Sequence, residues 1–218
     1  MPGVKTRTLR EHVDHLYRDA PLLLRIRQRL RLVAAPMDAV LSHYPEADRA
    51  LDIGCGGGLV LTFVAAMNKI KHGIGTDIDV GAIAAARIVA ETHNLPIDFR
   101  VTQVGEALPD GTFDVVSMVD VLHHIDPAEQ HAVFLEAAGR VAPGGRFFLK
   151  DIGTRPRWRA AMNTLHDLIF AQEWVHYVPD DQIARWAKEA NLDIELSTSY
   201  RTLWYGHRLW VFRRSDFV

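Results

Sequence analysis

The fold of this chain is decided by residues 50–67, which read ALDIGCGGGLVLTFVAAM. An apolar strand over 50–53 runs into a glycine turn, and a helix over 58–67 follows. Glycine has no Cβ atom, so the turn can be sharp and a ligand can lie against its backbone. A second apolar segment, 70–76, ends on Asp77, 23 residues after Gly54. This order is typical of a mononucleotide-binding half of a doubly wound sheet, where the strand-end acid binds ribose hydroxyls.

The glycine spacing distinguishes between cofactor classes. A dinucleotide fingerprint needs Gly-x-Gly-x-x-Gly, but here the glycines are Gly54, Gly56 and Gly58, and position 59 is Leu. With Asp52 before the turn, the segment resembles motif I of the class I S-adenosylmethionine-dependent methyltransferases. The resemblance implies that S-adenosylmethionine is the cofactor and S-adenosylhomocysteine the product. The implied cofactor contacts are made by Asp52, Gly54, Cys55, Gly56, Gly58, Asp77 and Ile78.

Three later segments fit the same family. Residues 113–118 predict the fourth strand, and the DVLHHI that follows at 120–125 resembles motif IV of small-molecule methyltransferases. APGGRFFL at 142–149 resembles the turn and fifth strand, and residues 192–199 and 203–212 predict a closing hairpin. The resemblance covers roughly residues 47–213. It implies an α/β, Rossmann-like, doubly wound sheet of seven mostly parallel strands with a C-terminal antiparallel hairpin.

The alternation of strands and helices agrees with a parallel sheet covered on both faces. Further strands are predicted at 97–101 and 146–151, and helices at 9–34, 36–44, 80–94, 127–141, 160–170 and 182–190. We predict an N-terminal helical cap over 1–45 and a cofactor-binding core over 46–218, with a lid insert at about 153–180. In the family, such an insert and the N-terminal helices cover the acceptor.

The remaining site residues are assigned by position. The residue predicted to contact adenine is Glu106, which lies in a Gly-acid-Ala pattern, or Gln103. Asp120 is also predicted to bind the cofactor. His123 and His124 are the catalytic candidates, because a general base is needed when a hydroxyl must lose a proton. The alternative is that one histidine packs against the cofactor and the other caps a helix. Candidate substrate contacts in and around the insert are Asp151, Arg157, Trp158, Asn163, His166, His176 and Tyr177.

Composition and charge exclude several classes of protein. The 218 residues carry a net charge of −2, which argues against a general polyanion binder and hence against nucleic acid. No run of 18 apolar residues predicts a membrane span, and the start of the chain lacks the apolar core of a signal peptide. The single cysteine, Cys55, suits a reducing cytoplasm and is better explained by packing than by nucleophilic chemistry. The histidines lack zinc-site spacing, so we expect no metal.

The segment LLLRIRQRLRLV (residues 22–33) carries four arginines and has three interpretations. In the first, the arginines form a solvated helix face. In the second, they form an anion-binding wall for a carboxylate or a carrier-bound acyl group. In the third, they make a peripheral contact with a membrane surface. Its apolar side is equally explained by docking on the core. A monomer and a homodimer both fit the sequence.

The predicted function is methyl transfer to a small-molecule acceptor, first at oxygen of a phenol or carboxylate. The resemblance is to the ubiquinone/menaquinone-type and secondary-metabolite branch. Transfer to nitrogen or carbon of a quinone-like, lipid-like or carrier-bound metabolite is the alternative. Two other classes remain: a nicotinamide-dependent oxidoreductase and a non-catalytic methyltransferase-fold binding protein.

Overall fold

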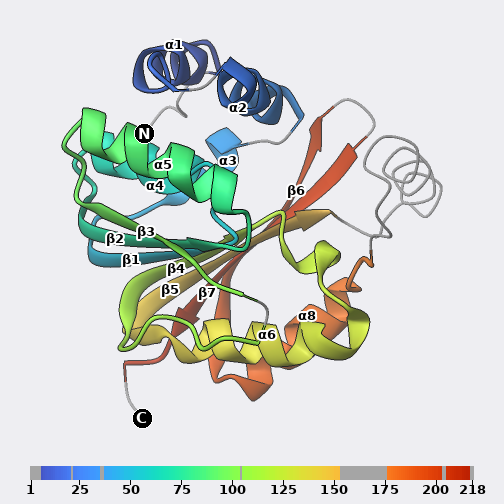
Figure 1. The fold of residues 1–218 in the computed structure, drawn as a ribbon. Helices are drawn as coiled ribbons and strands as arrows, with labels where there is room; N and C mark the ends of the chain where they lie inside the picture. Colours follow the sequence, from blue (N-terminus) through green and yellow to red (C-terminus); the bar gives the residue numbers. More distant parts are fainter. Residues whose placement is uncertain are drawn as a thin grey trace.

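The computed structural model describes residues 6–20, 22–34, 37–103, 105–152, 176–202 and 205–216. They form a seven-stranded sheet in the order β3-β2-β1-β4-β5-β7-β6, with helices on both faces (Figure 1). The strands are β1 (Ala47–Ile53), β2 (Ile70–Asp77), β3 (Ile97–Val101), β4 (Phe113–Val119), β5 (Val141–Ile152), β6 (Leu192–Thr202) and β7 (Tyr205–Arg214). The helices are α1 (Thr6–Leu16), α2 (Leu22–Ala34), α3 (Met37–His43), α4 (Leu59–Ala66), α5 (Val80–Thr92), the short 3₁₀ helix η1 (Leu122–His124), α6 (Pro127–Gly139) and α8 (Asp180–Glu189).

The strand order confirms the predicted doubly wound sheet. β3, β2, β1, β4 and β5 pair in parallel, whereas β7 pairs antiparallel with both β5 and β6. The chain order reverses between β1 and β4, and ligands of such sheets bind beyond the carboxyl ends of the strands at this switch point. The glycine turn after β1 and the 3₁₀ helix η1 after β4 both lie at that edge.

Two apolar clusters hold the helices against the sheet. Helices α1 to α5 pack on one face and α6 and α8 on the other (Figure 1). Phe99 of β3 and Phe148 of β5 belong to the first cluster, and Leu51 of β1 and Trp186 of α8 to the second. Side chains of α1 lie in the first cluster. The division of the chain at residue 45 stays a prediction.

The structure differs from the predicted elements at a few boundaries. β5 begins at Val141 rather than at residue 146, because the Pro-Gly-Gly segment stays in the strand, with Gly144 in the left-handed region at φ 72°. The register between β4 and β5 shifts there, between Phe113 and Val115. The predicted helix at 160–170 lies outside the described residues. Within the described residues, no helix is long and apolar enough to cross a bilayer.

One glycine in β2 is required by packing. A Cβ atom at Gly75 would lie 2.5 Å from Cδ1 of Phe99 and 3.0 Å from Sγ of Cys55. Both neighbours are buried, so neither side chain can move without disturbing the core.

Gly75→Ala is therefore expected to lower the free energy of unfolding by about 1–3 kcal/mol through overpacking. Gly139→Ala is the control, because a Cβ there meets no atom within 4 Å and the residue is helical. Denaturant unfolding of both variants measures the difference. Equal stability of the two variants would contradict the packing argument.

Candidate active site

The glycine turn packs directly on the segment that follows β4. Gly54 has a φ of 67°, and a Cβ atom there would lie 2.3 Å from Cγ2 of Val121. Gly56 and Gly58 also adopt positive φ, which side chains disfavour. The contact between Gly54 and Val121 brings the two predicted motifs together, with His123 only two residues beyond it.

Asp77 ends β2 beside this turn. Its Oδ2 accepts a hydrogen bond of 2.7 Å from the backbone N–H of Gly56, and its Oδ1 accepts one of 2.9 Å from the N–H of Asp79. Each carboxylate oxygen has a second lone pair, so the group retains capacity for two ribose hydroxyls. Asp79 caps α5 by accepting from the N–H groups of Gly81 and Ala82. The turn without side chains and the partly buried acid fit the nucleoside part of S-adenosylmethionine.

Asp52 lies beneath the turn in the interior. It is 2% exposed, and the Ser117 hydroxyl donates a hydrogen bond of 2.5 Å to its Oδ1. Burial, together with the Asp52 charge, raises the pKa of the Tyr44 hydroxyl well above its ordinary value. Cys55 is buried too, and its N–H donates to the Thr76 carbonyl at 2.9 Å, in agreement with a packing role. The contact of Asp52 with the methionine part of the cofactor stays a prediction.

The adenine candidates lie on an exposed turn. The backbone N–H of Gln103 donates to Oε2 of Glu106 at 2.8 Å, so the Glu106 carboxylate closes its own turn. Ile78, next to Asp77, is 59% exposed. A planar base could lie against such an exposed apolar side chain, but the assignment of adenine to these residues stays a prediction.

A buried histidine–carboxylate pair follows β4. Nδ1 of His123 is hydrogen-bonded to Oδ1 of Asp151, and the backbone N–H of His123 donates to Oδ2 at 3.2 Å. The N–H of Ile152 also donates to Oδ1 of Asp151, at 2.7 Å. The carboxylate thus fixes the ring and favours the tautomer that carries its proton on Nδ1. In the neutral ring the lone pair then lies on Nε2.

A second charged pair, between buried Lys150 and partly exposed Asp120, lies on the other face of β5. Nζ of Lys150 is 2.6 Å from both carboxylate oxygens of Asp120, and Lys150 is 1% exposed. Nδ1 of His207, on β7, is 4.0 Å from Oδ1 of Asp120. Asp120 adopts φ 58° and its N–H donates to the Lys150 carbonyl at 2.8 Å. In this left-handed backbone conformation the Asp120 carboxylate points back at β5, the strand that carries Lys150.

These charges act on the His123 imidazole. Burial lowers its pKa, but the charge and hydrogen bond of Asp151, with a further contribution from Asp120, outweigh burial. Lys150 opposes them, and the pKa of His123 is raised above its ordinary value.

The end of the insert is attached to η1. The N–H of His176 donates to the His123 carbonyl at 2.9 Å, while the buried Gln130 amide donates to the His176 carbonyl at 2.7 Å. The Tyr177 ring is 6.2 Å and the exposed His124 ring 4.0 Å from the His123 ring, centroid to centroid. The structure therefore brings His124, His176 and Tyr177 close to the pair formed by His123 and Asp151. The other predicted substrate contacts, Arg157, Trp158, Asn163 and His166, lie outside the described residues.

Sequence reasoning missed three residues near the site. One feature of the sequence could have indicated Lys150: it is a lysine inside the apolar strand FFLKDI (residues 147–152). His207 has none that separates it from the other histidines. The Tyr17 hydroxyl, which donates to the Gly57 carbonyl at 2.9 Å, lies directly after α1 and links the end of that helix to the glycine turn.

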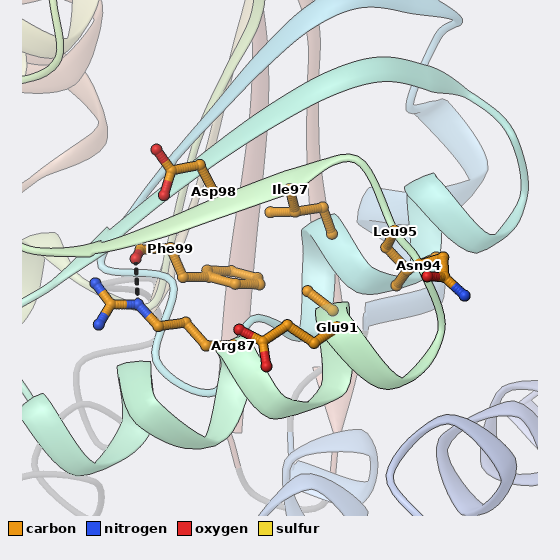
Figure 2. A pocket seen from close by; sticks show the side chains of 8 residues that line it. Arg87, Glu91, Asn94, Leu95, Ile97, Asp98 and Phe99 are labelled. Atoms are coloured by element: carbon orange, nitrogen blue, oxygen red, sulfur yellow. Dashed lines mark hydrogen bonds between the residues drawn. The ribbon is translucent and has the colours of Figure 1, made fainter.

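A groove of about 490 Å³ lies elsewhere, between α5 and the outer edge of β3 (Figure 2). Arg87 crosses it and donates from Nε to the Phe99 carbonyl at 2.7 Å. The groove contains none of the predicted site residues. Among the described residues, no group of three or more His, Cys, Asp or Glu side chains could hold a metal ion.

Sheet order, glycine turn and strand-end acid together define the class I methyltransferase fold. A family model described as a methyltransferase domain matches residues 10–197. The chain therefore belongs to this family, as a class I S-adenosylmethionine-dependent methyltransferase of the small-molecule type.

Named relatives agree with the family. A ubiquinone biosynthesis O-methyltransferase from Dechloromonas aromatica (strain RCB) is 30% identical over 166 residues, covering 71% of this chain and 69% of the relative. One from Hahella chejuensis is 28% identical and covers 67% of this chain but 63% of the relative. This chain thus spans slightly less than two thirds of that relative's length.

Solved structures share the fold. An O-methyltransferase family protein from Burkholderia thailandensis has a TM-score of 0.69 at 23% identity, covering 98% of this chain and 64% of that one. Magnesium protoporphyrin IX methyltransferase from Synechocystis PCC 6803, solved with bound S-adenosylhomocysteine, has a TM-score of 0.65 at 18% identity. Its match covers 99% of this chain and 90% of that one.

Asp151→Asn is expected to lower the pKa of His123, because the neutral amide removes the charge that outweighs burial. Protonation of His123 stabilises the wild-type fold below the unfolded-state pKa of about 6.5. That contribution is lost as the pH rises through the higher folded-state pKa. NMR titration of the His123 ring measures the shift.

The matched control is Glu189→Gln, which removes the exposed partner of His131 and leaves the His123 environment intact. The charge argument would be contradicted if His123 titrated at the same pH in Asp151→Asn as in the wild type.

Proposed function

We propose that this chain methylates an oxygen atom of a small phenol or carboxylic acid, with His123 as the general base for a phenol and Asp151 as the residue that positions His123. Bound S-adenosylmethionine would supply an electrophilic methyl group and leave as S-adenosylhomocysteine. The chain's own task is to hold the acceptor oxygen in line with that group and to remove its proton.

The contact between Gly54 and Val121 carries the proposal. It joins the turn expected to hold the cofactor to the segment that holds His123, so the base and the methyl donor share one edge of the sheet. A histidine with its Nδ1 proton held by a carboxylate presents Nε2 as the proton acceptor. After transfer, the Asp151 charge stabilises the imidazolium that forms.

The choice of oxygen rests on two supports. A phenol must lose a proton as the new bond forms, which gives a general base a role that a neutral amine acceptor does not require at the same step. A carboxylic acid is already ionised near neutral pH and needs only alignment. The relatives named above are O-methyltransferases of ubiquinone biosynthesis. Their names do not identify the acceptor of this chain, which a panel of phenols and carboxylic acids must find.

The assignment of Asp77 leads to a binding prediction. Asp77→Ala is expected to weaken S-adenosylhomocysteine binding at least about tenfold, because it removes the partner of two ribose hydroxyls. Asp79→Ala is the matched control: it removes the α5 cap, costing about 1 kcal/mol of stability, but keeps the backbone N–H that donates to Asp77.

Calorimetry on the wild type and both variants measures the difference, with nicotinamide dinucleotides as competing ligands. Binding of a dinucleotide in place of S-adenosylhomocysteine would favour the oxidoreductase alternative. Unchanged S-adenosylhomocysteine affinity in Asp77→Ala would contradict the ribose assignment.

The base assignment gives a kinetic prediction. His123→Gln is expected to lower kcat for a phenol acceptor about 10²–10⁴-fold and to leave S-adenosylhomocysteine affinity nearly unchanged. The loss should shrink as the pH approaches the phenol pKa of about 10, since an ionised acceptor needs no base. His131→Ala, which alters an exposed histidine on α6, is the control.

A loss of kcat that stays constant with pH would instead assign His123 a purely positioning role. Full activity of His123→Gln toward an amine or a carbon acceptor, with none toward oxygen acceptors in the wild type, would favour the alternative acceptors.

A further inference from the structure

Helix α2 turns its apolar stripe away from the protein. Leu22, Ile26 and Leu30 follow one another at intervals of four residues and are 68%, 44% and 63% exposed. Residues with this spacing share one face of a helix. Sequence alone explained this apolar side equally well by docking on the core, and the structure removes that explanation for these three residues.

Two described residues on the other side of α2 are buried. Gln28 and Leu32 are 2% and 6% exposed. Oε1 of Gln28 has no hydrogen-bond partner among the described residues. A helix that buries a glutamine and exposes three large aliphatic side chains is oriented against the usual hydrophobic preference. The exposed stripe therefore needs a partner to remove it from water.

The charge around the stripe is strongly positive. Residues 6–34 contain seven arginines and three acidic residues, a surplus of four positive charges in a chain whose net charge is −2. Helix α2 itself has four arginines and no acid. One of them, Arg29, pairs with Asp14 of α1 at 2.5 Å. In Figure 1 α1 and α2 lie outside α4 and α5, on the outer side of that layer.

These properties favour one kind of partner. A second copy of the chain, packed stripe to stripe, would bring two sets of arginines together. Three side chains also supply far less than the roughly 800 Å² per partner of a stable interface. An anionic lipid surface meets both requirements, because acyl chains accept aliphatic side chains while phosphates attract guanidinium groups.

We propose that α2 is a docking surface for an anionic lipid bilayer. The helix, about 20 Å long, lies parallel to the surface with Leu22, Ile26 and Leu30 inserted at the boundary between head groups and acyl chains. Arg25 and Arg29, each three residues after a member of the stripe and therefore next to it on the helix, contact the phosphates. This inference rests on the surface alone and does not depend on the proposed methyl transfer.

The test is flotation of the full chain with vesicles of phosphatidylcholine, with and without phosphatidylglycerol. Binding is expected only with the anionic lipid, and it should weaken at least about fivefold from 50 to 500 mM salt, as charges are screened. The triple variant Leu22→Gln, Ile26→Gln, Leu30→Gln should bind at least about tenfold more weakly, while glutamine keeps helix propensity.

The matched control is Met67→Gln, Ile88→Gln, Ile194→Gln, which alters three aliphatic residues of 40–48% exposure on other elements. It should bind vesicles as the wild type does. Thermal unfolding midpoints and circular dichroism show whether each variant folds, so loss of binding is read only from folded protein.

The proposal is overturned by equal binding of the wild type to neutral and anionic vesicles, by its failure to bind either, or by unchanged binding of the triple variant. A concentration-dependent dimer in sedimentation experiments that the triple variant abolishes, without vesicle binding, would assign the stripe to a second copy and also overturn it.

Discussion

Gly54 and Val121 approach one another so closely that no side chain fits at the glycine. A Cβ atom would be 2.3 Å from the valine methyl carbon, and the φ of 67° independently favours glycine. This contact sets the distance between the turn after β1 and the segment after β4. Asp77 on one side and His123 on the other are therefore brought to the same edge of the sheet, because the Val121 side chain packs against Gly54.

The charged residues of the site are placed by the pleat of β5. Successive side chains of a strand point to opposite faces, so Lys150 reaches Asp120 while Asp151 reaches His123. Taking such groups out of water costs several kcal/mol per ion, which the partner charge only partly recovers. Buried pairs of this kind contribute little net stability. Their effect is to fix the positions of the groups, which is what catalysis by alignment needs.

Local patterns in the sequence predicted the strands, the glycine turn and the closing hairpin, because each is determined by residues close together in the chain. The partners of Asp120 and His123 were not predictable in this way, since Lys150 and Asp151 lie about 30 residues later and meet them only through sheet pairing. The orientation of α2 was missed for a related reason. Its apolar stripe is visible in the sequence, but which side faces the protein depends on how α1 packs on α4 and α5.

The site also depends on the last strand. His207 lies on β7, opposite Ile152 of β5, and its Nδ1 is 4.0 Å from the Asp120 carboxylate that pairs with Lys150. The polar groups at this edge therefore come from β4, β5 and β7, and they come together only when the antiparallel strand has paired with the parallel part of the sheet. Side chains held on paired strands vary less in position than side chains on loops. The antiparallel hairpin thus both closes the sheet and completes the rigid floor on which the acceptor oxygen and the base would be aligned.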